Sequence, residues 1–173
     1  VAGLLFLAAP SFLSSYYLGL LTKMLIFALF AMSLDLLLGY TGLPSLGHAA
    51  YFGLGAYTVA LLALKVAVKT LWIGSLASLA SVLVLALGFG PLTLRARGDY
   101  FLMITLALSQ VIWGVAFGWR SMTGGDDGLP GITRPALAGS LSIAGEVPFY
   151  YFVLIVFALA LWLLAVIVRS PFG

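Results

Sequence analysis

The chain is organised around the stretch Gly39-Tyr-Thr-Gly-Leu-Pro-Ser-Leu-Gly-His-Ala-Ala-Tyr-Phe-Gly-Leu-Gly55, which lies between two long apolar runs. Its first part, Gly39–Pro44, holds two glycines and a proline, and this composition cannot continue a regular helix. The chain's only histidine, His48, follows shortly after the proline. The stretch therefore predicts the end of one helix, a tight polar turn and the beginning of a second helix.

Small residues recur at every fourth position after this break. Ser45, Ala49 and Gly53 would lie on one face of the second helix, and a face of small side chains lets another helix approach closely inside a membrane. Gly114 and Gly118 form a Gly-x-x-x-Gly pair of the same kind later in the chain. Ser45 is also placed to cap the second helix, because its hydroxyl can satisfy a free backbone N–H.

The composition indicates a membrane protein built of helices. The chain has 173 residues, of which 64% are hydrophobic and 8% charged, and its mean hydropathy is +1.21. A soluble domain of this size could not bury so much apolar surface. Because lipid offers no hydrogen bonds, the spanning segments must be helices or a closed barrel, and long continuous apolar runs exclude the barrel. We expect an all-α, polytopic fold surrounded by membrane lipid.

Charge and cysteine content exclude several classes of function. The formal net charge of +3 comes from 8 basic and 5 acidic residues, which are too few and too scattered for binding to nucleic acid. There is no cysteine, so disulfides and thiolate metal sites are excluded. A metal site at His48 would lack a ligand set, because no second histidine exists and no glutamate is nearby. We expect neither a metal nor a cofactor.

The apolar runs predict about six membrane segments in one domain that covers residues 1–173. The first, Val1–Leu13, is shorter than the ~20 residues that a full span needs, and Pro10 interrupts it. The others are Leu18–Leu38, Leu46–Leu64, Leu71–Leu94, Tyr100–Trp119 and Pro148–Val168. Because the chain starts inside an apolar run and ends just after Pro171, we expect a fragment of a longer domain.

Two ionisable residues, Asp35 and His48, flank the break. A carboxylate within a span is costly and usually faces a cavity or a partner; alternatively, Asp35 lies shallow enough to reach water. His48 could contact a ligand or exchange a proton, or it could be a packing residue at the start of a helix. The functional interpretation gives a candidate translocation path formed by the residues of the break, namely Asp35, Tyr40, Thr41, Gly42, Ser45, Gly47 and His48.

Two polar segments connect the later apolar runs. The turn Arg95-Ala-Arg-Gly-Asp99 is either a solvated loop or a docking surface. The long segment Arg120–Val147 contains a glycine-rich run that makes turns. Asp126 and Asp127 in this run could bind calcium, but the ligand spacing of an EF-hand loop is missing, and a plain flexible loop is the alternative.

Two long motifs resemble a known family. Gly39–Tyr57 looks like the signature of the permease subunits of branched-chain amino acid ABC importers. Similarity to the M-type rather than the H-type of these subunits extends over Leu94–Ala107 and over Trp119–Gly131. Arg169-Ser-Pro-Phe-Gly173 resembles the start of the family's cytoplasmic coupling segment. The chain departs from the pattern at Asp35, where the family usually carries asparagine, and it lacks the rest of the coupling segment and the helices beyond it.

The resemblance implies half of a translocation pore in a bacterial or archaeal inner membrane, for branched-chain amino acids or related amide or urea-like solutes. It implies an H-type permease, two cytoplasmic ATPase subunits and an extracytoplasmic substrate-binding protein as partners, so that ATP chemistry lies outside this chain and the chain is not an enzyme. The implied cytoplasmic coupling residues are Arg95, Arg97, Gly98, Asp99 and Arg169. The implied loop facing the binding protein is Thr123, Gly124, Gly125, Asp126, Asp127 and Gly128.

Two other classes of function stay open at this point. One is an ion-coupled secondary transporter or channel with Asp35 and His48 as coupling sites. Transport that survives ATP depletion but collapses with the proton gradient would favour it. The other is an intramembrane enzyme that uses Ser45 or His48, which would be removed if both could be replaced by alanine without loss of function.

Overall fold

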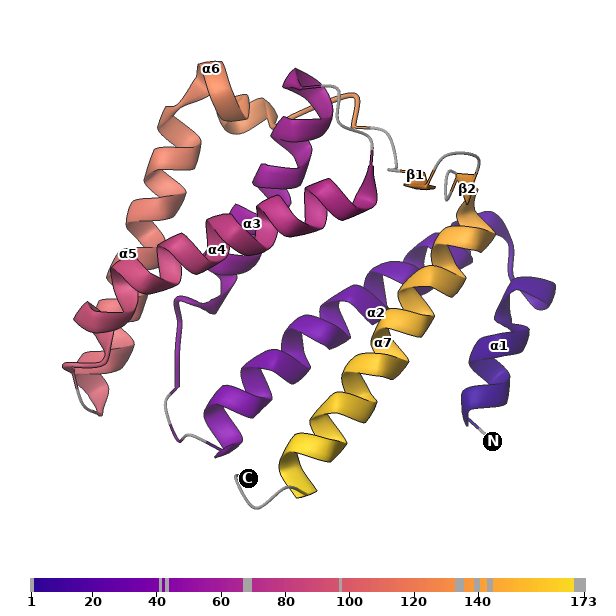
Figure 1. Ribbon diagram of the computed structural model, residues 1–173, viewed down its shortest axis with the longest axis horizontal. Coiled ribbons are helices and arrows are strands. Elements are labelled where there is room, and N and C mark those ends of the chain that lie inside the picture. The colour runs from indigo at the N-terminus through magenta and orange to yellow at the C-terminus, as the bar shows by residue number, and fades with distance from the viewer. Residues whose placement is uncertain are drawn as a thin grey trace. The chain divides into compact units, whose positions relative to one another are not determined.

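The computed structural model describes residues 2–40, 42, 44–66, 70–96, 98–132, 136–138, 141–142 and 145–169. Helices follow one another along the chain, as the apolar runs predict (Figure 1). They are α1 (Ala2–Phe12), α2 (Ser15–Asp35), the π-helical turn η1 (Leu36–Tyr40), α3 (His48–Lys65), α4 (Leu71–Thr93), α5 (Asp99–Gly118), α6 (Arg120–Thr123), the 3-10 turn η2 (Gly125–Asp127) and α7 (Glu146–Arg169). Two short strands, β1 (Ala136–Ala138) and β2 (Leu141–Ser142), pair with each other.

Four helical segments are long and apolar enough to cross a membrane, within the part of the chain that the structure describes. They are Ser15–Tyr40, Leu71–Thr93, Asp99–Gly118 and Glu146–Arg169. A helix pairs its own backbone groups, which a lipid surrounding requires, and the all-α, polytopic class is thereby confirmed. The predicted number of six segments is not confirmed, since α1 has only 11 residues and α3 is not among the four segments that are both long and apolar enough.

The predicted helix break is present. α2 continues without an ordinary cap into the π turn, and helical structure stops at Tyr40, inside the expected break Gly39–Pro44. The hydrogen bonds of a π turn span one more residue than those of an α-helix, and such turns often occur at functional sites. The next helix begins only at His48.

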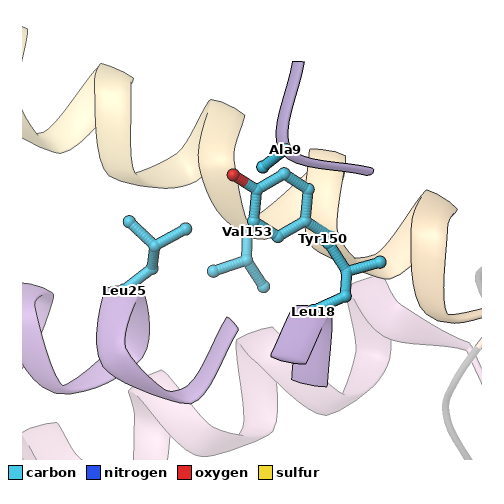
Figure 2. Close-up of a cluster of buried hydrophobic side chains, with 5 residues drawn as sticks. All are labelled: Ala9, Leu18, Leu25, Tyr150 and Val153. Carbon is cyan, nitrogen blue, oxygen red and sulfur yellow. The ribbon is translucent and has the colours of Figure 1, made fainter. Parts of the chain in front are cut away.

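The chain divides into two compact units, one formed by Val1–Leu36 with Ser142–Gly173 and the other by Leu37–Leu141. In the first unit α2 and α7 lie side by side (Figure 1). Their buried side chains form one apolar cluster with a residue of α1, and Figure 2 shows the Tyr150 ring between these neighbours. The cluster consists of Ala9, Leu18, Leu25, Tyr150 and Val153.

Pro10 lies inside α1, so the expectation that it interrupts this segment is wrong. Proline has no N–H, and the carbonyl four residues earlier, that of Phe6, therefore loses its helical donor. The Tyr150 hydroxyl donates to this carbonyl oxygen at 2.8 Å. The Tyr151 hydroxyl donates to the carbonyl of Leu7 at 3.1 Å. A tyrosine of α7 thus replaces the hydrogen bond that the proline removes.

In the second unit α3 packs against α4 in the antiparallel direction. Gly55 of α3 lies against Ser78, whereas Val59, one turn later, lies against Gly74 of α4. A Cβ atom on Gly55 would stand 2.8 Å from the Ser78 hydroxyl oxygen, which is closer than Cβ atoms approach other non-bonded heavy atoms. The small residues therefore set the distance between these two helices, as in other membrane helix pairs.

Candidate functional site

Thr105 of α5 holds the chain just before α3. The backbone N–H of Leu46 donates to the Thr105 hydroxyl oxygen at 3.2 Å, and the same hydroxyl donates to the Leu102 carbonyl within α5 at 3.0 Å. Only 6% of the Thr105 surface is exposed. Leu46 precedes the N-cap Gly47 and lies outside α3, and a backbone N–H shielded from water needs a hydrogen-bond partner. The Thr105 hydroxyl therefore satisfies a backbone N–H group of the helix break.

Gly47 brings the backbone of the break into direct contact with α5. It is the N-cap of α3, and a Cβ atom added to it would lie 2.9 Å from the Thr105 carbonyl oxygen. The N-cap is Gly47, which has no side chain, and it makes no side-chain cap hydrogen bond, so the expected capping role of Ser45 is wrong. A capping hydroxyl belongs to the N-cap residue itself, and Ser45 precedes that position by two residues.

The far end of α3 is held by a second contact. The Lys65 ammonium donates to the Ser121 carbonyl at 3.2 Å and lies 3.1 Å from the Met122 sulfur. Because the beginning of α3 meets the beginning of α5 and its end meets the helix that follows α5, the two helices run parallel. Leu46 and Lys65 therefore mark opposite ends of the same bundle.

The structure brings part of the predicted translocation path together. Ser45, Gly47 and His48 lie at the docked beginning of α3, where Gly47 is buried and the other two are half-buried. Asp35 is exposed at the last position of α2, in the other unit, so its proximity to His48 stays a prediction. The remaining path residues are the exposed Tyr40 and Gly42, the latter with a φ of 65°, and Thr41, which lies outside the described residues.

The predicted packing faces differ from the close contacts within this chain. Ala49 is exposed, and nothing in the described residues lies within 4 Å of a Cβ built on the three predicted glycines, Gly53, Gly114 and Gly118. The close approaches occur instead at Gly47 and at Gly55. Packing through the predicted faces stays a prediction for contacts beyond the described chain.

The turn before α5 places charged groups at a helix terminus. Gly98 is the N-cap of α5 with a φ of 58°, a left-handed conformation that only glycine adopts without strain. Asp99 opens the helix, where a carboxylate interacts favourably with the helix dipole. Arg95 and Asp99 are exposed, as is Arg169 at the end of α7. Arg97 lies outside the described residues.

The first part of the glycine-rich run, residues 123–127, forms a hydrogen-bonded corner. The Thr123 hydroxyl donates to the carbonyl of Trp119 at 2.9 Å and also to that of Ala116. Gly124 has a φ of 76°, and a Cβ atom there would collide with the carbonyl oxygen of Gly128. Gly125 donates its N–H to the Thr123 hydroxyl at 3.3 Å.

This corner presents its two carboxylates outward. Asp126 and Asp127 are exposed in η2. Among the described residues, no group of three His, Cys, Asp or Glu side chains lies close enough to hold a metal ion. The corner therefore offers a fixed acidic surface at the end of α6, next to the contact between Lys65 and Ser121.

Comparison with known proteins identifies the family. The family model described as "Branched-chain amino acid transport system / permease component" matches residues 16–173. The chain belongs to this family. It is similar to the "High-affinity branched-chain amino acid transport system permease protein LivM" of Salmonella typhimurium, with 31% identity over 134 residues that cover 76% of the chain and 31% of the relative. The Escherichia coli protein of the same name is 30% identical over the same length and coverage.

The chain spans about a third of the length of these curated relatives. No solved structure matches it. The match to the permease family includes the helix break, α5 and the glycine-rich corner, and it confirms the resemblance found in the sequence. The chain is a multi-pass membrane protein of the permease family.

Thr105 is the residue in contact with the helix break that the sequence did not single out. It lies in the quoted motif Leu94–Ala107, but a threonine in an apolar helix usually donates to its own helix, as Thr22 does to the Leu18 carbonyl at 2.8 Å. Thr105 makes such a bond and accepts another from a residue 59 positions earlier. The contact between Thr105 and the break forms only when the chain folds. In the sequence it is visible only as a polar residue within an apolar span.

Proposed function

We propose that the chain is a membrane-spanning subunit of an ATP-binding-cassette importer in a bacterial or archaeal inner membrane. Its solutes would be branched-chain amino acids or related small polar compounds such as amides or urea-like molecules. The observation that carries the proposal is the family match over residues 16–173. The names of both relatives, which describe high-affinity branched-chain amino acid transport, support the same solute class.

The proposed assembly contains a second permease subunit of the H-type, two cytoplasmic ATPase subunits and an extracytoplasmic substrate-binding protein. ATP chemistry belongs to the ATPase subunits, since the chain contains no Gly-x-x-x-x-Gly-Lys loop to bind phosphates. The exposed Arg95, Asp99 and Arg169 would face the ATPase side. The corner with Asp126 and Asp127 would face the binding protein.

The solute path in this proposal passes the helix break. Discontinuous helices in transporters leave backbone groups free to bind polar solutes near a cavity. Gly42 and residues 44–47 have this character, because they lie outside the helices after an apolar span. Asp35, at the end of α2, would contribute to the polar lining.

The decisive experiment compares energy sources. Uptake of radiolabelled leucine is measured in vesicles that contain the assembled transporter and its binding protein, before and after ATP depletion and before and after collapse of the proton gradient. We expect uptake to require ATP and the binding protein and to survive loss of the gradient. Uptake that survives ATP depletion but collapses with the gradient would instead identify an ion-coupled transporter that uses Asp35 and His48.

A labelling experiment tests the orientation. The chain has no cysteine, so Arg95→Cys gives a single reactive thiol in it. We expect a membrane-impermeant maleimide to reach this thiol only from the cytoplasmic side. A cysteine at Asp126 is the matched control and should react only from the outside, and the reverse pattern would overturn the proposed arrangement.

A further inference from the structure

One residue, Thr105, joins the second turn of α5 to the helix break. Thr105 accepts the Leu46 N–H at 3.2 Å, and its carbonyl oxygen lies where a side chain on Gly47 would have to stand. Both contacts come from the same residue, and they fix the two residues that immediately precede α3. The position of the break is therefore set by the position of the second turn of α5.

The same turn of α5 follows the proposed ATPase-facing turn without interruption. Thr105 lies six residues after Asp99, the first residue of α5, which is about 9 Å along a helix axis. The intervening sequence Tyr-Phe-Leu-Met-Ile contains neither glycine nor proline, the usual causes of a helix kink. Displacement of the turn at Gly98 and Asp99 therefore reaches Thr105 through a rigid segment.

We propose that Thr105 is the positioning residue through which the turn before α5 controls the helix break. The inference rests on the proposed function, because it takes Arg95–Asp99 as the ATPase-facing side. The hydrogen bond from Leu46 is at the long end of the usual range for N–H···O bonds, and it is a single bond to a neutral hydroxyl. Such a contact can open and close during a transport cycle, whereas the bond from Thr105 to Leu102 keeps the hydroxyl in place.

The test compares substitutions at two buried threonines, Thr105 and Thr22. Thr105→Val keeps the shape of the side chain and removes the acceptor for the Leu46 N–H, and Thr105→Ser restores it. Thr22→Val is the control, because Thr22 is also buried and its hydroxyl bonds only to its own helix at Leu18. Each variant carries a single cysteine at Leu46, which is exposed and is not among the predicted path residues, and two quantities are measured in the assembled transporter: ATP-dependent leucine uptake and the rate of maleimide labelling.

We expect Thr105→Val to raise the labelling rate at least threefold, because the break is released from α5, and to lower uptake at least fivefold, because α5 no longer moves it. Thr105→Ser should return both values to within twofold of the parent, and Thr22→Val should change neither. Parental labelling in Thr105→Val, or parental uptake despite faster labelling, would overturn the inference. If the parent shows no ATP-dependent leucine uptake, the proposed function is wrong. The labelling rates of the Thr105 variants still show in that case whether Thr105 holds the break.

Discussion

The α2–α7 pair and the α3–α4 pair are held together by opposite kinds of contact. Between α2 and α7 the packing comes from a cluster of apolar side chains, of which Leu18, Leu25 and Tyr150 are the largest. Between α3 and α4 the contact is made by Gly55, Gly74 and hydroxyl groups, including those of Thr58 and Ser81, which are 2.9 Å apart. The first pair is held by interlocked side chains and the second by backbone proximity.

This difference suggests which part of the molecule can rearrange. Interlocked side chains fix the register of two helices, because sliding would force them past each other in a densely packed interior. Small residues and hydroxyls leave a smoother surface with weak individual bonds. We therefore expect α2–α7 to act as a fixed frame, and the bundle of α3, α4 and α5, which carries the break, to contain the movable contacts.

The largest effect should come from filling the glycine contact of the second pair. Gly55→Leu places a side chain where a Cβ atom alone would stand 2.8 Å from the Ser78 oxygen, and overpacking of this kind costs about 1–3 kcal/mol. We expect a large loss of folded protein and of uptake. The midpoint of unfolding in mixed micelles and the yield of the assembled transporter measure it.

Gly53→Leu is the matched control on the same helix. A Cβ atom at Gly53 meets nothing within 4 Å among the described residues, so the unfolding midpoint should stay unchanged. Loss of assembly or uptake in Gly53→Leu at normal stability would show that the predicted face of Ala49 and Gly53 contacts another subunit. Equal destabilisation by both variants would contradict the glycine contact between α3 and α4.

A smaller effect is expected in the α2–α7 frame at Tyr150. Tyr150→Phe keeps the buried ring but removes the donor to the Phe6 carbonyl, and a lost hydrogen bond of this kind costs about 1 kcal/mol. Pro10→Ala supplies a backbone N–H for the same carbonyl, so Tyr150→Phe should cost less in that background. The unfolding midpoints of the four proteins form a double-mutant cycle, and additive effects would mean that the tyrosine does not replace the bond lost at the proline.

The hydroxyl pair between α3 and α4 should contribute less still. Thr58→Val removes the contact with Ser81, and interhelical hydrogen bonds in membranes average about 0.6 kcal/mol. We expect a small shift of the unfolding midpoint. Ser75→Ala is the control, because its hydroxyl bonds only to the Leu71 carbonyl of its own helix, and a larger effect there would contradict the assignment.

The sequence was sufficient for features that depend on local chemistry. Long apolar runs predicted the helices, and glycine and proline in Gly39–Pro44 predicted the break, because both act on the backbone where they stand. The sequence alone could not show which glycine, Gly53 or Gly55, makes the close contact with another helix. Both are small residues of one helix, and only the position of α4 makes Gly55 the contact.

Contacts between residues distant in sequence also explain the two wrong predictions, that of Ser45 as a cap and that of Pro10 as a helix interruption. Ser45 has the right chemistry for a cap, but docking of Gly47 on Thr105 sets where α3 begins. Pro10 has the right chemistry to end a helix, but the Tyr150 hydroxyl, 140 positions later, replaces the missing donor. In each case a residue distant in sequence overrides the local signal.

The smallest effect is expected at Asp35, where α2 leaves the frame and enters the π turn. The family resemblance places asparagine at this position, and an amide can form hydrogen bonds without the desolvation cost of a charge. Because Asp35 is exposed at the end of α2, Asp35→Asn should change neither the unfolding midpoint nor leucine uptake. Asp35→Leu removes all hydrogen-bonding capacity and should lower uptake at unchanged stability, if the carboxylate lines the path. Uptake is compared at matched membrane expression, and full activity of Asp35→Leu would mean that this residue only touches water or lipid headgroups.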